Sequence, residues 1–155
     1  MLVTDETRMR ELGAALIAAC DRGGVITLQG DLGTGKTTLV RGALQARGVV
    51  SGVRSPTYTL IEYYPFDDFA VAHFDLYRLG DPEELEYLGY RDYLNARTLC
   101  LIEWPQRAAG YLQAVDLAID LEYDPAGRRV AAQAQSEWGA AVLSGWLPGE
   151  FPRSS

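Results

Sequence analysis

Cysteine and histidine are scarce in this chain of 155 residues. It has two cysteines and one histidine, and Cys20 and Cys100 lie far apart in apolar surroundings, without a C-x-x-C spacing. Disulfide frameworks and zinc sites need such residues in clusters at short spacings. We therefore expect neither, and we interpret both cysteines as reduced core residues of a cytoplasmic protein.

Positive charge is the second shortage. The chain has 14 Lys and Arg residues against 21 Asp and Glu residues, which gives a formal net charge of −7. Proteins hold nucleic acid backbones mainly through Lys and Arg, because these side chains neutralise the phosphates. The composition argues against direct binding of nucleic acid. Any nucleic acid in the function is expected to be contacted by a partner.

Long apolar segments are absent as well. No apolar run approaches the roughly 18 residues that span a bilayer, and the opening MLVTDETRMRELG is too polar for a signal peptide. We expect no membrane association. Hydrophobic residues make up 48% of the chain, enough for one core at this length. We predict a single domain over residues 1–148 and a flexible tail over residues 149–155.

What the sequence does contain is a glycine-rich loop, GDLGTGKTTLV, at residues 30–40. Residues 30–37 match the Walker A pattern G-x-x-x-x-G-K-[ST] in full. The glycines let consecutive backbone N–H groups converge on phosphates, and the following helix adds its positive end. Lys36 then supplies an ammonium to the outer phosphates, and Thr37 offers a hydroxyl to Mg²⁺. The loop predicts a nucleotide site.

Helix and strand patterns alternate on both sides of this loop. Helices are expected after Thr4 as N-cap, from Lys36 to near Gly48, after Asp81 as N-cap, and around Trp138 to Trp146. Strands are expected at residues 25–29, 59–64, 70–75, 98–103, 114–123 and 128–135. The last two strands form a hairpin. We predict an α/β fold of three layers, P-loop NTPase-like, with a mixed, mostly parallel central sheet and a C-terminal antiparallel hairpin.

Two carboxylates end apolar strands, where a P-loop site needs acidic groups near its metal. Asp75 follows VAHF and Glu103 follows LCLI. Either alone is also compatible with an exposed charge at a strand end. Together they are expected to share the Mg²⁺ shell, one directly and the other through water, because Mg²⁺ keeps several waters. The sequence leaves open which one ligates directly.

Two further features near the loop have plainer interpretations. The segment SPTYTL, residues 55–60, either is a phosphate-sensing switch, as in GTPases, or is a turn leading into a strand. His73, the single histidine, is expected to be a packed or hydrogen-bonded side chain on its strand rather than a catalyst.

The ordered set GDLG-x-GKTT, SPTYTL, HFDLYR and EWP, together with GDPEELEYLGYRDY, resembles the bacterial TsaE (YjeE) family from about Leu12 to Glu122. The resemblance implies a small ATPase needed to make threonylcarbamoyladenosine in tRNA, next to the anticodon. It implies that the chain does not transfer the group itself. Instead, it binds the TsaB–TsaD complex and resets it by hydrolysing ATP to ADP with Mg²⁺. The tRNA would be reached only through these partners.

The resemblance also assigns roles to single residues. Thr37 and Glu103 take the metal positions, Asp75 a Walker-B-like position, and Lys36, Asp75 and Glu103 together the catalytic positions. Phosphate-binding positions fall on Gly33, Thr34, Gly35, Lys36, Thr37 and Thr38. Thr57 is implied on the γ-phosphate side, Trp104 in coupling to the partner, Arg128 near the adenine and Thr7 on the other side of the base.

No catalytic base stands out, so we expect weak ATPase activity alone and stimulation by the partner complex. A small metabolite kinase is one alternative, although its lid would be residues 80–97, which hold five carboxylates and two arginines. A GTPase is disfavoured because no N-K-x-D motif occurs. A binding module switched by nucleotide, with incidental hydrolysis, is the remaining alternative.

Overall fold

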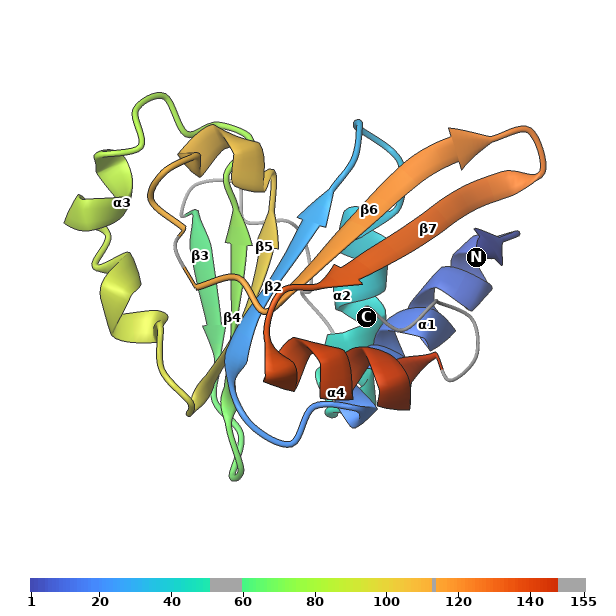
Figure 1. Cartoon of the computed structure of the whole chain (residues 1–155), viewed down its shortest axis with the longest axis horizontal. Helices are drawn as coiled ribbons and strands as arrows, with labels where there is room; N and C mark the ends of the chain where they lie inside the picture. The colour runs from blue at the N-terminus through green and yellow to red at the C-terminus, as the bar shows by residue number, and fades with distance from the viewer. Residues whose placement is uncertain (51–59, 113, 148–155) are drawn as a thin grey trace.

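The computed structural model describes residues 1–50, 60–112 and 114–147. Its strands are β1 (Leu2–Val3), β2 (Gly24–Gln29), β3 (Ile61–Tyr64), β4 (Ala70–Asp75), β5 (Thr98–Glu103), β6 (Leu117–Asp124) and β7 (Gly127–Ala134). Its helices are α1 (Glu6–Ala18), α2 (Lys36–Ala46), α3 (Glu84–Tyr87) and α4 (Glu137–Trp146), with 3₁₀ turns η1 (Tyr90–Tyr93) and η2 (Pro105–Ala108). Figure 1 shows their arrangement.

The described strands form one sheet in the order β1-β7-β6-β2-β5-β4-β3. The central pairs β6-β2, β2-β5 and β5-β4 are parallel, whereas β3, β7 and β1 join through antiparallel pairs. The β6-β7 hairpin has the predicted position and direction. The predicted mixed sheet, mostly parallel in strand direction, is therefore confirmed. The carboxyl ends of its central strands lie together at the top of Figure 1.

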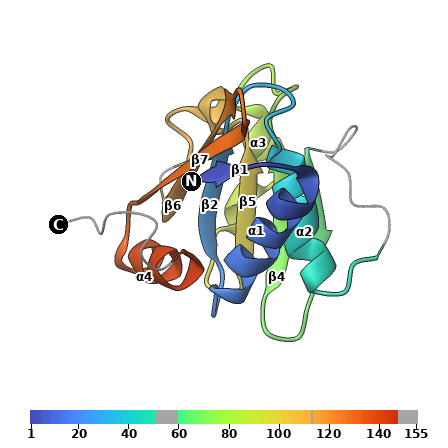
Figure 2. The same ribbon diagram turned by 90° about the vertical axis from the view of Figure 1, so that its right-hand side faces the viewer.

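Hydrophobic cores form on both faces of this sheet, which gives three layers. One core joins α1, α2 and α4 to side chains such as Leu28 and Leu101. The other lies under α3, η1 and η2 and includes Phe74, Ile102 and Tyr90. Figure 2 shows α1 and α2 side by side against the first face. The central strand β5 is buried along its whole length, as its apolar sequence predicted.

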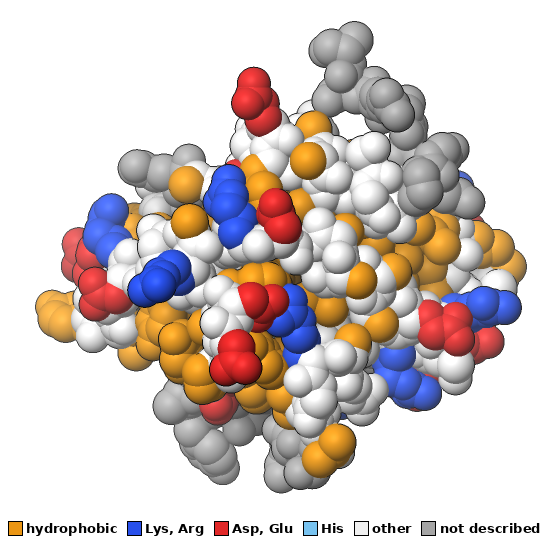
Figure 3. Space-filling model, turned by 90° about the horizontal axis from the view of Figure 1, so that it is seen from below, with side chains coloured by type: hydrophobic (Ala, Val, Ile, Leu, Met, Phe, Trp, Pro, Cys, Tyr) orange, Lys and Arg blue, Asp and Glu red, His pale blue; other side chains and the backbone are white. Residues whose placement is uncertain are grey.

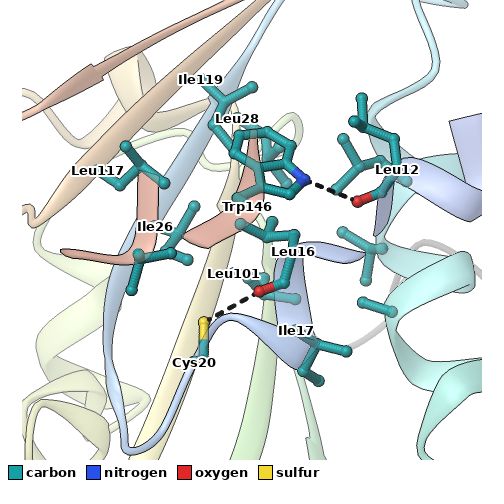
Figure 4. Packing of buried hydrophobic residues seen from close by; sticks show 14 of the residues in the cluster. Leu12, Leu16, Ile17, Cys20, Ile26, Leu28, Leu101, Leu117, Ile119 and Trp146 are labelled. Carbon is teal, nitrogen blue, oxygen red and sulfur yellow. Dashed lines mark hydrogen bonds between the residues drawn. The ribbon is translucent and has the colours of Figure 1, made fainter. Parts of the chain in front are cut away.

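The tryptophan of α4 ties the last helix to the first. In Figure 4, Trp146 packs beside Leu28 and Ile119 of the sheet and points its indole nitrogen at α1. That nitrogen donates a hydrogen bond of 2.9 Å to the backbone oxygen of Leu12. Because a buried indole N–H needs an acceptor, this bond fixes the position of α4 on the core.

Two predicted helix starts differ from the structure. The N-cap of α1 is Asp5, not Thr4, because the Asp5 carboxylate accepts the backbone N–H of Arg8 at 2.8 Å. Asp81 does not cap a long helix: its side chain accepts the N–H of Glu83 at 3.0 Å and closes a turn. Helix α3 then lasts one turn before Gly89, whose φ is 68°. The tail predicted over residues 149–155 lies outside the described residues.

At the opposite end of the sheet, side chains of both charges occur among the described residues. In Figure 3 acidic and basic side chains are interspersed with hydrophobic ones on this face. No helix in residues 1–50, 60–112 or 114–147 is both long enough and apolar enough to span a membrane.

Candidate functional site

The glycine loop lies between β2 and α2, at the carboxyl edge of the sheet. Gly33 and Gly35 have φ of 80° and 107°, and Gly35 is the N-cap of α2. Added Cβ atoms would lie 2.7 Å from the Tyr123 hydroxyl at Gly33 and 2.9 Å from a Met9 methyl at Gly35. Both the backbone conformation and the lack of space therefore require glycine here. The loop lies between a strand and a helix, which is the structural context expected of a Walker A motif.

Lys36 points back into the loop that precedes it. Its ammonium donates to the backbone oxygen of Gly30 and, at 2.9 Å, to that of Asp31. The residue is buried, and this burial lowers the pKa of Lys36 despite the opposing charges of Glu103 and Asp75. The lysine is a cation surrounded by protein oxygens, and phosphate oxygens would offer it the same kind of ligand.

Thr37 and Glu103, predicted as the metal pair, lie in direct contact. The Thr37 hydroxyl is 3.0 Å from each carboxylate oxygen of Glu103. Glu103 is buried, and its Oε2 lies 2.6 Å from Nε2 of His73. A hydroxyl and a carboxylate side by side are the hard oxygen ligands that Mg²⁺ prefers. The residues present thus fit a magnesium ion at the start of α2.

Asp75 lies beside Glu103, because the two are register partners on β4 and β5. The Asp75 carboxylate accepts the backbone N–H of Tyr77 at 3.1 Å. Within the described residues no group of three or more His, Cys, Asp and Glu side chains is arranged to hold a metal by itself. A metal at Thr37 and Glu103 would therefore need further ligands, such as phosphate oxygens and water.

A cavity of about 400 Å³ opens over these groups and is of a size that suits small ligands. It is lined by Lys36, Thr37, Thr38, Asp75 and Glu103, and also by Trp104. The structure therefore brings together the predicted catalytic and metal residues in one hollow. Leu32 and Tyr77, which lie inside the quoted motifs GDLG and HFDLYR, also line it, as does Glu6, which lies in no motif.

A second cavity of about 240 Å³ adjoins the first, since both are lined by Glu6, Gly33, Gly35 and Thr38. Thr34 and Arg128 also line the second cavity. Arg128 donates to the backbone oxygen of Gly33 at 3.3 Å and lies over the Tyr123 ring, 4.6 Å from its centroid. The predicted base-side arginine is thus next to the loop, on the β6-β7 hairpin.

Two predicted residues are not brought into these cavities. Thr7 is exposed on α1, where its hydroxyl accepts a hydrogen bond of 3.4 Å from Arg10, and it lines neither cavity. Its neighbours Asp5 and Glu6 line the smaller one. Thr57, predicted on the γ-phosphate side, lies outside the described residues. Its role stays a prediction.

The chain is similar to a known protein family and to several of its members. The family model described as "Threonylcarbamoyl adenosine biosynthesis protein TsaE" matches residues 3–131. A Haemophilus influenzae protein, "tRNA threonylcarbamoyladenosine biosynthesis protein TsaE", is 47% identical over 120 residues, covering 77% of this chain and 76% of that protein. A Nostoc protein of the same description is 34% identical over 135 residues, covering 84% and 82%.

A solved structure has the same architecture. Bacillus subtilis YdiB superposes with a TM-score of 0.79 at 24% sequence identity, covering 94% of this chain and 91% of that one. At this identity the match shows a common fold. The family model, by contrast, spans most of the chain and includes the glycine loop, Asp75 and Glu103. This chain belongs to the TsaE family of threonylcarbamoyladenosine biosynthesis proteins.

Proposed function

We propose that this chain is a Mg²⁺-dependent ATPase that supports threonylcarbamoyladenosine modification of tRNA in the cytoplasm. One observation carries the proposal: Lys36, Thr37 and Glu103 line one cavity beside a complete Walker A loop. The names of its relatives supply the pathway, since they are tRNA threonylcarbamoyladenosine biosynthesis proteins. The choice of ATP rather than GTP as the nucleotide rests on the missing N-K-x-D motif and on the family resemblance.

Each residue in the cavity has a task in this proposal. Backbone N–H groups of the loop and the N-terminus of α2 bind the phosphates, and Lys36 turns from Gly30 and Asp31 toward them. Thr37 and Glu103 hold the metal, with Asp75 beside them. Bound magnesium neutralises charge that develops on the transferred phosphoryl group. Arg128 and the smaller cavity flank the loop where a base would lie.

The charge of the cavity supports slow hydrolysis by the chain alone. Among the described residues, Lys36 is the one cationic side chain that lines the larger cavity. P-loop hydrolases commonly need an additional cation, often an arginine from a partner, to stabilise the transition state. We therefore propose that TsaB–TsaD completes the site, and that hydrolysis resets this complex. The net charge of −7 fits a chain that does not bind the tRNA itself and whose partners contact it instead.

An assay of phosphate release tests the proposal. Phosphate release from ATP should be slow with purified protein and should rise when TsaB–TsaD is added, while a Lys36→Ala control stays inactive. Equal turnover with and without the partners contradicts the completed site. A phosphorylated metabolite in place of free phosphate would support the kinase alternative instead.

A genetic experiment tests the pathway. Expression in bacteria depleted of their own TsaE should restore threonylcarbamoyladenosine in bulk tRNA, and Lys36→Ala should not. Glu103→Ala separates an ATPase from a switched binding module. If this variant binds ATP, fails to hydrolyse it and still restores the modified nucleoside, hydrolysis is incidental.

A further inference from the structure

The chain's one histidine lies behind the proposed metal ligand. His73 is on β4 and Glu103 is on the adjacent parallel strand β5, where His73 pairs with Leu101. The His73 side chain is 0% exposed and that of Glu103 is 3% exposed. The 2.6 Å contact between Nε2 and Oε2 is therefore shielded from water and joins two neighbouring strands.

The direction of this hydrogen bond follows from its partners. An ionised carboxylate only accepts, so Nε2 carries the proton and donates it to Oε2. The other ring nitrogen, Nδ1, is buried and has no hydrogen-bond partner among the described residues. A proton on Nδ1 would be a buried, unpaired donor, which is unfavourable. Among the described residues the ring therefore has a partner at one nitrogen, Nε2, and that partner is Glu103.

Burying a ring nitrogen without a hydrogen-bond partner costs free energy, which a side chain that only fills space would avoid. Val71, which shares the face of β4 with His73, is buried and apolar, and an apolar residue at position 73 would leave no orphaned nitrogen. Unsatisfied buried polar atoms in native proteins call for an explanation. The hydrogen bond from His73 to Glu103 provides such an explanation.

A hydrogen bond of this kind would fix the orientation of the Glu103 carboxylate. In the present structure its carboxylate is held on one side by the Thr37 hydroxyl and on the other by His73. Thr37 is the other proposed ligand, so its hydroxyl would serve the metal and Glu103 at once. Hydrogen bonds behind ligating groups fix their orientation and tune metal affinity. Of the two bonds, the one from His73 comes from a residue that is not itself a proposed metal ligand.

We propose that His73 is a positioning residue whose Nε2–H holds the Glu103 carboxylate in the orientation that receives Mg²⁺. The proposal rests on the proposed function, because it concerns the same metal site. In this proposal His73 neither contacts the nucleotide nor transfers a proton during ATP hydrolysis. Its effect is on the metal requirement of binding, with the phosphate-binding loop itself unchanged.

The first test needs no nucleotide. Because His73 is the only histidine, ¹⁵N labelling of histidine gives one set of ring signals. We expect the Nε2–H tautomer, with a ring proton that exchanges slowly with water. In Glu103→Ala this protection from exchange should be lost. A ring that exchanges its proton rapidly, or that carries it on Nδ1, overturns the proposal even if ATP binding is later confirmed.

The second test separates positioning from packing. His73→Gln keeps an N–H donor near the position of Nε2, whereas His73→Leu fills similar space without one. Calorimetric ATP titrations at a series of Mg²⁺ concentrations should show that His73→Leu needs about tenfold more Mg²⁺ for half-maximal binding, in line with other groups behind metal ligands. His73→Gln should restore the requirement, and ATP binding in EDTA should be equal in all three proteins.

The outcomes distinguish the two proposals. Wild-type protein that binds no ATP with Mg²⁺ contradicts the proposed function, while the NMR result on His73 stands by itself. Wild-type protein that binds ATP, with an unchanged Mg²⁺ requirement in a folded His73→Leu variant, contradicts the positioning role alone. If His73→Leu does not fold, the tautomer and the behaviour of His73→Gln decide: a raised Mg²⁺ requirement in folded His73→Gln counts against the role of the donor.

Discussion

The ammonium of Lys36 lies 4.3 Å from the centroid of the Trp104 ring. Tyr77 packs on the same indole, with ring centroids 4.9 Å apart. Trp104 has a φ of 59° and is the one non-glycine with positive φ among the described residues. Such a backbone conformation is unfavourable for a bulky residue and tends to occur at functional sites. The indole is thus held over the lysine that the proposed phosphates would engage.

This contact predicts that Trp104 reports nucleotide binding. Phosphates would draw the Lys36 ammonium away from its present carbonyl ligands and change the charge near the indole. ATP with Mg²⁺ should change the intrinsic tryptophan fluorescence of the wild type. Trp104→Phe should lose most of this change. Trp138→Phe is the matched control, because Trp138 lies on α4 and bonds to Asp21. A change that persists in Trp104→Phe contradicts the prediction.

Lys36 should lower the free energy of unfolding of the nucleotide-free protein. Burial lowers its pKa, so the unfolded state holds the proton more tightly than the folded state does. At neutral pH the charge therefore costs folding free energy, and this cost disappears as the pH passes the ordinary lysine value of 10.5. Lys36→Met without nucleotide should melt at or above the wild-type temperature at neutral pH. The difference should shrink toward pH 10.5.

The same variant provides its own functional control. With ATP and Mg²⁺ the wild type should gain thermal stability in proportion to the logarithm of ligand concentration, and Lys36→Met should gain none. Thermal melts with and without nucleotide at several pH values measure both effects. A Lys36→Met protein that is clearly less stable than the wild type at neutral pH would show that the lysine stabilises the empty loop.

Local signals in the sequence predicted the fold and the centre of the site. Glycine spacing and the strand-to-helix setting identified the loop, and the strand ends placed Asp75 and Glu103 at the same edge of the sheet. The bond from His73 to Glu103 was not predictable, because it joins residues 30 positions apart on different strands. Glu6 was missed for the same reason: α1 packs along α2, and no pattern in its sequence indicates this.

The length of α3 was another limit. Asp81, Pro82 and the acids after them have the composition of a helix start, yet the structure uses Asp81 for a turn. Composition gives the preference of a short segment, while packing decides how far the helix continues. Here Leu85 and Tyr90 are buried and Gly89 bends the chain between them. The apolar side chains of this segment therefore cover the sheet in two short turns.

The contact between α1 and α2 should depend on glycine at two positions. An added Cβ at Gly13 would overlap the backbone oxygen of Leu39, and one at Gly42 would overlap that of Arg10. Alanine is the better helix former by about 1 kcal/mol, but overpacking against backbone costs about 1–3 kcal/mol or more. Gly13→Ala and Gly42→Ala should each lower the free energy of unfolding in urea.

Gly145 on α4 is the matched control for these two substitutions. Its added Cβ would lie 3.6 Å from the Cβ of Ala19, an ordinary contact. Gly145→Ala should therefore be neutral or stabilise by up to about 1 kcal/mol. Equal effects at all three positions would mean that helix propensity, and not the close approach of α1 and α2, dominates.

The two cysteines should make the protein sensitive to alkali. Burial raises the pKa of Cys20 and of Cys100 from 9.0 to about 12. Above pH 9.0 the unfolded thiols lose their protons while the folded ones keep them, so the stabilisation is complete below pH 9.0 and is lost as the pH rises toward 12. Each thiol then lowers the free energy of unfolding by about 1.4 kcal/mol per pH unit.

Comparison with a Cys20→Ala/Cys100→Ala variant isolates this effect, because Lys36 and the tyrosines titrate in both proteins. Urea unfolding between about pH 8 and pH 10.5 should show a steeper loss of stability in the wild type. The variant starts lower, since it loses buried atoms, and the two curves should converge as the pH rises. Parallel curves would mean that the folded thiols ionise as readily as the unfolded ones, and iodoacetamide should then modify the native protein at alkaline pH.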